Sequence, residues 1–326
     1  MATEKTNHHP RDVPCPNAED ISPCVCTVID ASDFDMEMDC SSVSSNTDLA
    51  RIFSEHFPFN NFYSLIIYNN IHLRTIRAGD LGQISFKRID IWSGNLQSVE
   101  TNAFLHSYDT LEYLEISSNM LTAFPYSEIS MFNHLTTLNL RSNQLGGIPT
   151  VASLTLQSLY LNNNPITGIN PSSLPLLYTI GLSFTAITHI PTGTFSGLSR
   201  LTNIDLTNNK LEVLDPGTIN LQTSYNWVYL TTNSITSIAE GALMGLRGSL
   251  YVQNNQLTEL AEGVFRPLMD MDVTVYAESN PLACGCEIAW LVLNSVYVDQ
   301  LMDDTTCFSG ELVRNLDPDV YASLCH

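Results

Sequence analysis

One eleven-residue pattern recurs along most of this chain. It has the form LxxLxLxxNxL, with apolar residues at positions 1, 4, 6 and 11 and asparagine at position 9. Clear copies are LEYLEISSNML from Leu111, LTTLNLRSNQL from Leu135, LQSLYLNNNPI from Leu156, LTNIDLTNNKL from Leu201 and YNWVYLTTNSI from Tyr225. Weaker copies align on position 9, which then reads Asn70, Gly94, Asn119, Asn143, Asn164, Thr185, Asn209, Asn233, Asn255 and Asn280. Ten copies spaced 21 to 25 residues apart predict that one structural unit is stacked many times.

The chemistry of the pattern indicates the shape of each unit. Side chains in the LxL segment alternate, so Leu138 and Leu140 should face the core while Asn139 faces solvent, as in a short β-strand. The asparagine at position 9 should turn inward, where its amide can satisfy backbone groups of the turn. Gly94 has no side chain for this task and Thr185 can fulfil it only in part. We therefore expect local irregularity at both positions.

The repeat length and the pattern are those of leucine-rich repeats. One such unit cannot bury its own apolar face, so neighbouring units must stack with their strands parallel. Ten strands about 4.8 Å apart give a concave sheet about 45 Å long. Apolar residues of the second half of each repeat, such as Phe195 and Leu198, should line the convex side. The sequence predicts an α/β leucine-rich-repeat solenoid, with a curved parallel β-sheet on the concave face and irregular, 3-10 or short helical segments on the convex face.

The cysteines lie outside the repeats, four before the first copy and four after the last. They are Cys15, Cys24, Cys26, Cys40, Cys284, Cys286, Cys307 and Cys325. An even number at each end favours two disulfide bonds per cap, although spacing alone leaves three pairings open for each set. The Cys-x-Cys motifs differ from the CxxC pairs of a zinc ribbon and no histidine lies at ligand spacing, so we expect no metal site. The predicted organisation is a polar tail at 1–14, a cysteine-rich N-terminal cap at 15–58, ten repeats at 59–282 and a cysteine-rich C-terminal cap at 283–326.

Three local patterns predict how the caps are built. The segment DFDMEMD at 33–39 alternates acidic and apolar residues, which indicates an edge strand with charge on its open side. Its core-facing residues are Phe34, Met36 and Met38. Further along, four residues fall on one helical face and predict a short helix that joins the cap to the repeats. These residues are Leu49, Ile52, Phe53 and His56. In the C-terminal cap, Trp290 follows the Cys-x-Cys motif and should be a core residue.

Charge and motifs exclude several classes of function. Acidic residues outnumber basic residues 34 to 13, and the net charge of -21 argues against a nucleic-acid partner, whose affinity comes from Lys and Arg. No stretch of about 20 apolar residues is present that could span a membrane. The sequence has no nucleophile elbow, phosphate loop, dinucleotide motif or zinc-protease motif. The histidines are scattered at His8, His9, His56, His72, His106, His134, His189 and His326. We expect a binding protein with no catalytic residues and no cofactor.

The outward strand positions offer the best candidate for a binding surface. The residue between the two inward leucines runs Ile66, Asp90, Glu115, Asn139, Tyr160, Gly181, Asp205, Tyr229, Tyr251 and Tyr276. Three consecutive tyrosines should form a ladder, and aromatic side chains of this kind are enriched at interface hot spots. The alternative is that the rings stack on one another merely to cover an exposed sheet. The candidate partner-binding residues are Tyr160, Asn226, Trp227, Tyr229, Tyr251 and Tyr276, with a second patch of Tyr63, Tyr68 and Trp92.

The cysteine-containing segments resemble those of a known class. CPNAEDISPCVC and NPLACGCEIAWL resemble the N- and C-terminal cysteine-rich flanks of extracellular leucine-rich-repeat proteins. In that class the first cysteine of each flank pairs with the third and the second with the fourth. The resemblance therefore implies the pairs Cys15–Cys26, Cys24–Cys40, Cys284–Cys307 and Cys286–Cys325. It also implies secretion, although the first ten residues, MATEKTNHHP, lack the apolar centre of a signal peptide.

Longer sequence segments resemble one particular family within this class. Four segments are similar to the arthropod family of the luciferase non-catalytic subunit, part of the oplophorus-luciferin 2-monooxygenase complex. They are FPFNNFYSL, RAGDLG, YVQNNQLTELAEGVFRPL and NPLACGCEIAWLV. The similarity covers nearly the whole chain after the first dozen residues. It implies a secreted binding or stabilising subunit, with the chemistry on a separate small catalytic subunit. We expect the concave face to recognise a protein partner. The alternative is a secreted recognition receptor of the innate-immune type, with a glycan or lipid ligand.

Overall fold

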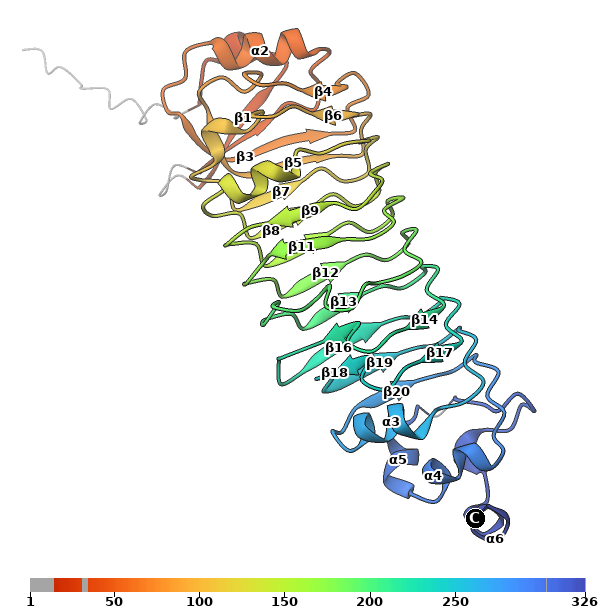
Figure 1. Cartoon of the computed structure of the whole chain (residues 1–326). Coiled ribbons are helices and arrows are strands. Elements are labelled where there is room, and N and C mark those ends of the chain that lie inside the picture. Colours follow the sequence, from red (N-terminus) through yellow and green to blue (C-terminus); the bar gives the residue numbers. More distant parts are fainter. Residues whose placement is uncertain (1–14, 31–34, 303, 326) are drawn as a thin grey trace, which may run out of the picture.

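The computed structural model describes residues 15–30, 35–302 and 304–325 as one elongated, gently curved stack of coils (Figure 1). The two caps lie at opposite ends of the stack, and each successive coil lies beside the one before it. The predicted polar tail at 1–14 lies outside the described residues, as do Asp33, Phe34, His8, His9 and His326.

Among the described residues, one strand from each coil joins a single sheet of twelve strands, in chain order. These strands are β1 (Val25–Asp30), β2 (Asp35–Asp39), β3 (Asn61–Tyr68), β5 (Ser85–Trp92), β7 (Tyr113–Glu115), β8 (Thr137–Asn139), β10 (Ser158–Tyr160), β12 (Thr179–Gly181), β13 (Asn203–Asp205), β16 (Asn226–Tyr229), β19 (Gly248–Tyr251) and β20 (Thr274–Tyr276). All neighbours from β2 to β20 pair in parallel. The prediction of a leucine-rich-repeat solenoid is therefore confirmed.

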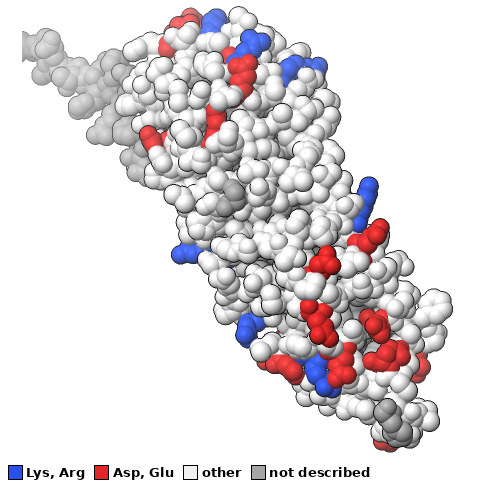
Figure 2. Space-filling model, viewed as in Figure 1, with Lys and Arg blue, Asp and Glu red and all other residues white. Residues whose placement is uncertain are grey.

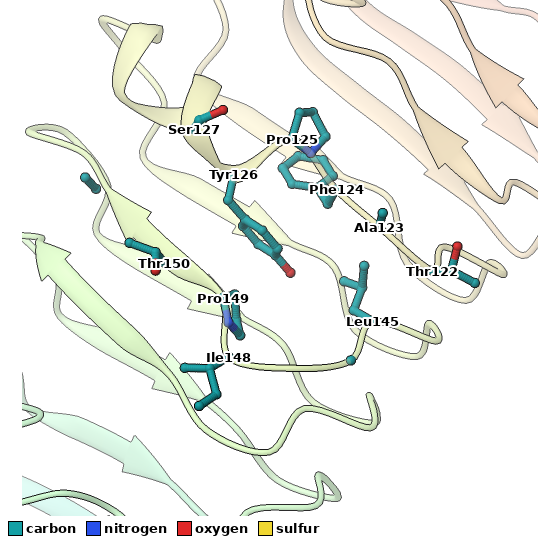
Figure 3. Close-up of a pocket in the computed structure, with 12 residues that line it drawn as sticks. Thr122, Ala123, Phe124, Pro125, Tyr126, Ser127, Leu145, Ile148, Pro149 and Thr150 are labelled. Atoms are coloured by element: carbon teal, nitrogen blue, oxygen red, sulfur yellow. The ribbon is translucent and has the colours of Figure 1, made fainter.

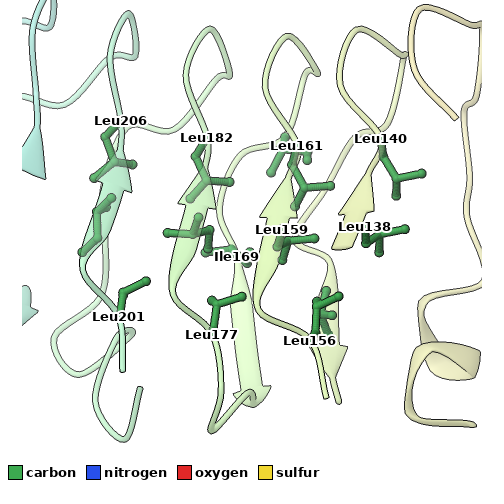
Figure 4. Packing of buried hydrophobic residues seen from close by; sticks show 14 of the residues in the cluster. Leu138, Leu140, Leu156, Leu159, Leu161, Ile169, Leu177, Leu182, Leu201 and Leu206 are labelled. Atoms are coloured by element: carbon green, nitrogen blue, oxygen red, sulfur yellow. The ribbon is translucent and has the colours of Figure 1, made fainter. Parts of the chain in front are cut away.

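The core is a continuous file of leucines and isoleucines behind this sheet (Figure 4). Leu138 and Leu140 of one coil lie beside Leu159 and Leu161 of the next, and all four are fully buried. Burying one such side chain contributes about 1.5–3 kcal/mol relative to leaving it in water. Each coil buries this face only because a neighbour covers it, so the stack is stable as an array.

The inward asparagines connect each coil to the one before it. Nδ2 of Asn143 donates to the carbonyl oxygens of Ile116 (2.7 Å) and Leu140 (3.0 Å), and its Oδ1 accepts from the amide of Leu121 (3.0 Å). Asn164 repeats the arrangement one coil later, with Oδ1 accepting from the amide of Leu145 at 3.0 Å. A single side chain thus satisfies backbone groups that would otherwise be buried without partners.

The expected irregularity at Gly94 and Thr185 is wrong. The residue before position 9 has a positive φ in the regular coils, for example 55° at Ser142, and Ser93 (58°) and Phe184 (54°) keep the same turn. At Gly94 an added Cβ would lie 2.9 Å from Oδ1 of Asn119, which accepts from the amide of Leu96 at 3.1 Å, as the asparagine of the next coil does elsewhere in the stack. The Thr185 hydroxyl lies 2.6 Å from Oδ1 of Asn209, the asparagine of the next coil. The turn therefore keeps its backbone form at both positions, and the next coil's asparagine keeps its regular bond to the preceding coil.

The convex side is built from short and varied elements, as expected. The strands there are β4 (Thr75–Ile76), β6 (Ser98–Val99), β9 (Thr150–Ala152), β11 (Asn170–Ser173), β14 (Val213–Leu214), β15 (Ile219–Asn220), β17 (Ser237–Ile238) and β18 (Leu243–Met244). They form two-stranded parallel pairs between coils. The helical elements are the 3-10 helices η1 (Leu105–Ser107) and η2 (Tyr126–Met131) and the α-helix α3 (Glu262–Met269). Phe195 and Leu198 are buried on this side.

The N-terminal cap contains one strand that the sequence patterns did not reveal. Helix α1 (Ala18–Ile21) leads into β1, which pairs antiparallel with β2, while β2 pairs in parallel with β3. The segment at 35–39 is therefore an inner strand, and the prediction that it forms the edge is wrong. Met36 and Met38 face the core as expected.

The predicted helix of this cap is α2 (Asn46–Ser54). It buries Leu49, Ile52 and Phe53 as expected. His56 lies beyond the end of the helix and is exposed, so the helical face is shorter than expected.

The C-terminal cap is helical and covers the last coil. It comprises η3 (Cys286–Ile288), α4 (Ala289–Val292), α5 (Ser295–Gln300), η4 (Val313–Asn315) and α6 (Pro318–Leu324). Trp290 is buried and its indole N–H donates to the carbonyl oxygen of Leu260 at 3.1 Å. Disulfide bonds join Cys284 to Cys307 and Cys286 to Cys325 in this cap, and Cys15 to Cys26 and Cys24 to Cys40 in the other. This is the pairing that the resemblance implies.

Candidate partner-binding face

The outward side chains of the main sheet form rows that cross the coils. The residues between the inward leucines are in register from one end to the other, so they form one continuous central row. Its members are Ile66, Asp90, Glu115, Asn139, Tyr160, Gly181, Asp205, Tyr229, Tyr251 and Tyr276. A second row lies two residues earlier on each strand and includes Arg88, Tyr113, Asn203 and Trp227. The concave surface can therefore be described strand by strand.

Three tyrosines at the C-terminal end of the central row form a stacked ladder. The ring centroids of Tyr229 and Tyr251 are 4.4 Å apart with an interplanar angle of 11°, and those of Tyr251 and Tyr276 are 4.3 Å apart at 17°. Trp227 lies beside the ladder and packs edge-to-face against Tyr225 at 4.7 Å. Stacked rings lose little freedom when a partner covers them, so they are suited to a binding surface.

The hydroxyls of Tyr229 and Tyr276 remain protonated at neutral pH. Burial raises the pKa of Tyr229, and its neighbour Tyr251 and the charge of Asp205 raise it further. Burial also raises the pKa of Tyr276, with a further contribution from a hydrogen bond to Tyr251. The ladder thus presents apolar ring surface together with the protonated hydroxyls of Tyr229 and Tyr276.

Asn226 does not belong to this surface, contrary to the prediction. Its side chain is completely buried, with Nδ2 donating to the carbonyl oxygens of Thr223 (3.2 Å) and Gly245 (3.1 Å). Its Oδ1 accepts from the amide of Arg247 at 2.9 Å. Asn226 begins β16 one residue before the outward Trp227, so the alternation of the strand turns it inward. Its role is to bridge coils.

A hollow of about 360 Å³ lies between Tyr160 and Tyr229. The row has no side chain at Gly181, and Asp205, which is half-buried, lines the hollow beside it. The side chain of Asn162 lies against Gly181, and its Nδ2 donates to the Ser183 hydroxyl at 2.6 Å. We refer to this hollow as the Gly181 notch.

The N-terminal half of the concave face contains a larger hollow of about 760 Å³, which is lined by charged side chains. Arg88 donates from Nε and Nη2 to the two carboxylate oxygens of Asp90, at 2.5 and 2.8 Å, and lies 3.7 Å above the ring of Tyr113. Arg141 lies 3.9 Å from Glu115. Burial raises the pKa of Asp90 while Arg88 opposes that shift. The charges in this half are therefore largely paired with one another.

The second predicted patch lies at the rim of this hollow. Tyr68 and Trp92 contact each other with centroids 5.0 Å apart, and Lys87 Nζ lies 6.0 Å from the ring of Tyr63. Tyr63 and Trp92 line the hollow, whereas Tyr68 lies just outside it. The structure therefore pairs Tyr68 with Trp92, but Tyr63 lies five residues away on β3, about 16 Å, so the three residues do not form one patch.

A further hollow of about 570 Å³ lies on the convex side, between η2 and β9 (Figure 3). Phe124, Pro125, Ile148 and Pro149 form apolar walls around the ring of Tyr126. The Tyr126 hydroxyl is buried without a hydrogen-bond partner, and burial raises its pKa. No sequence signal pointed to this hollow, because its walls come from two different coils. Its lining offers no group for acid–base chemistry at neutral pH.

Within the described residues, the side chains that commonly bind metals do not gather into a site. No group of three or more His, Cys, Asp or Glu side chains within them could hold a metal ion. His56, His72, His106, His134 and His189 are all exposed on separate coils. No helix within the described ranges is long and apolar enough to cross a membrane. Figure 2 shows acidic side chains gathered over the C-terminal part of the visible face.

Comparisons with known proteins agree with this architecture. Leucine rich repeat family models match residues 84–145, 155–177 and 175–221. A chain of the solved octameric complex of Latrophilin 3, Unc5D and FLRT2 superimposes with a TM-score of 0.71 at 24% identity, covering 86% of this chain and 88% of that one. That likeness shows the fold alone.

Sequence relatives identify the family. Mouse podocan is 30% identical over 177 residues, which cover 52% of this chain and 28% of podocan. The oplophorus-luciferin 2-monooxygenase non-catalytic subunit of Oplophorus gracilirostris is 37% identical over 321 residues, which cover 96% of this chain and 89% of that protein. This chain belongs to the family of that non-catalytic subunit, and it is a leucine-rich-repeat binding protein rather than an enzyme.

Proposed function

We propose that this chain is an extracellular, non-catalytic subunit that binds a protein partner through its concave face, with the tyrosine ladder as the principal contact. The partner we propose is a small catalytic subunit, as the name of the shrimp relative suggests. The extracellular location is supported by the four disulfide bonds, which persist in oxidising compartments.

The ladder carries this proposal. Tyr229, Tyr251 and Tyr276 present a stacked, half-exposed aromatic strip on the outward side of the main sheet. Aromatic anchors at the centre of an interface typically contribute 2 kcal/mol or more each. The alternative, that the rings merely stack to cover the sheet, explains their contacts with one another. It does not require that one side of the strip be left uncovered.

The test compares two triple variants with the unchanged chain. The ladder variant carries Tyr229→Ala, Tyr251→Ala and Tyr276→Ala. The control carries Ile148→Ala, Met244→Ala and Phe308→Ala, which truncate exposed side chains outside the concave face. Each tagged protein is incubated with native secretions, and recovered proteins are quantified by mass spectrometry.

The expected result is one small protein recovered in stoichiometric amount by the unchanged chain and the control, and lost with the ladder variant. Equal recovery by all three proteins would remove the ladder from the interface. Retention of the chain on glycan or lipid supports, with no protein recovered, would favour the recognition-receptor alternative. Oxidation of luciferin by the purified chain alone would contradict a non-catalytic role.

A further inference from the structure

The charges of the concave face are arranged differently in its two halves. In the N-terminal half, each outward arginine has an acidic partner, Asp90 for Arg88 and Glu115 for Arg141. From β10 to β20, none of the outward strand positions holds a lysine or an arginine. Asp205 therefore lies in a half of the face that offers aromatic rings and carboxylates but no basic side chain. Among the ion pairs of the described residues, none includes Asp205.

The environment of Asp205 repeats that of Asp90 with one group missing. Arg88 lies two residues before Asp90 on β5 and is in register with Tyr113 on the next strand, so its guanidinium contacts both the carboxylate and the ring. Around Asp205, the residue two positions earlier is Asn203, and its register partner on the next strand is Trp227. The acid and the aromatic residue recur, but an asparagine occupies the position of the arginine.

Asp205 is held in place by the protein yet keeps capacity to accept more hydrogen bonds. Its Oδ1 accepts from the amide of Thr207 at 3.0 Å, and its Oδ2 lies 3.4 Å from Nδ2 of Asn162. A carboxylate offers about four lone-pair sites, so a bidentate donor can still be accommodated. The Gly181 notch of about 360 Å³ leaves room for such a donor.

We propose that the Gly181 notch receives an arginine side chain of the protein partner, which forms a bidentate pair with Asp205 and packs against the neighbouring aromatic rings. This inference rests on the proposed function and deepens it, because it specifies the chemistry of the partner. A guanidinium matches the site better than a neutral sugar does, since it compensates the carboxylate charge as the partner covers it. Tyr160 and Tyr229 are three strands apart, about 14 Å, which is too wide for them to sandwich one sugar ring.

The test uses a defined probe and does not depend on the unknown partner. The peptide acetyl-Gly-Arg-Gly-amide is titrated into the full chain while the backbone amides of Gly181, Asp205 and Thr207 are followed by NMR. Its citrulline counterpart has the same shape without the charge. The expected result is a saturable shift of these amides with the arginine peptide and at least tenfold weaker binding of the citrulline peptide.

Two variants and a control locate the effect. Asp205→Asn removes the charge but keeps an oxygen for the Thr207 amide, and it should weaken binding at least tenfold. Asn203→Arg should recreate the Arg88–Asp90 pair within the chain and abolish binding. Asp215→Asn makes the same charge change at a residue beside His189, away from the notch, and should leave binding unchanged.

Equal shifts with both peptides, or shifts that survive both Asp205→Asn and Asn203→Arg, would overturn the proposal. So would saturable shifts of the same amides with neutral chitotriose that persist in Asp205→Asn, because the notch would then be a glycan site. The ladder variant could lose its partner in the pull-down while the arginine peptide fails to bind the unchanged chain. That pair of results would refute only the arginine notch. The proposed function would then stand on the ladder alone.

Discussion

Removal of one inward asparagine should lower the free energy of unfolding, by an amount that follows from the hydrogen bonds that are lost. In Asn143→Ala, the amide of Leu121 and the carbonyl oxygen of Ile116 lose the side-chain partner that they have in the native coil. The carbonyl oxygen of Leu140 keeps a donor, because Asn164 Nδ2 also bonds to it at 3.0 Å. Two buried groups are therefore left unsatisfied, at about 1–3 kcal/mol each, so the free energy of unfolding should fall by about 2–6 kcal/mol.

The assay is equilibrium unfolding in guanidinium chloride, followed by far-ultraviolet circular dichroism. The midpoint should move to lower denaturant with an unchanged slope, since the surface exposed on unfolding is the same. Asn133→Ala is the control, because Asn133 is exposed in a connecting segment and bonds there to Asp109. If the free energy of unfolding of Asn143→Ala lay within about 0.5 kcal/mol of that control, the inward asparagines would not stabilise the contacts between coils.

Two further outcomes are expected. Reduction of the disulfides should increase amide hydrogen exchange in the caps before the central coils, because the bridges, each typically contributing about 2–4 kcal/mol, are confined to the ends; faster exchange in the central coils first would contradict this. Tyr126→Phe should raise the free energy of unfolding by about 1 kcal/mol, because it removes a buried hydroxyl that has no partner; a loss of stability in the same unfolding assay would show that the hydroxyl is satisfied.

The repeat pattern predicts the parts of this molecule that depend on local alternation. The positions of Leu138 and Leu140, and the row that ends in Tyr276, follow from a period of two residues and a constant coil length. The same reasoning fails for Asn226, because a shift of one residue turns a side chain from the surface to the core.

Features that depend on contacts between coils could not be predicted. Strand β1 has exposed apolar residues, Val25 and Ile29, as well as the inward Cys26 and Val28, so its apolar residues do not mark one face. The Gly181 notch exists because Asn162 of one coil leans over a glycine of the next and bonds to Ser183. The sequence gives each of these residues, but it does not give the distances between their side chains across neighbouring coils. The domain boundaries at residues 58 and 282 stay a prediction.

The reversed direction of β1 has a consequence for how such a molecule can grow. Each coil adds to the stack by continuing a parallel ladder, but β1 closes the N-terminal end with a strand that runs the opposite way. An additional coil placed against that end would find no template for its turns or for its inward asparagine. A coil that continues the parallel ladder and its file of inward asparagines therefore cannot be added beyond β1. The reach of the binding surface is thus set within each chain, by the number of coils between its two ends.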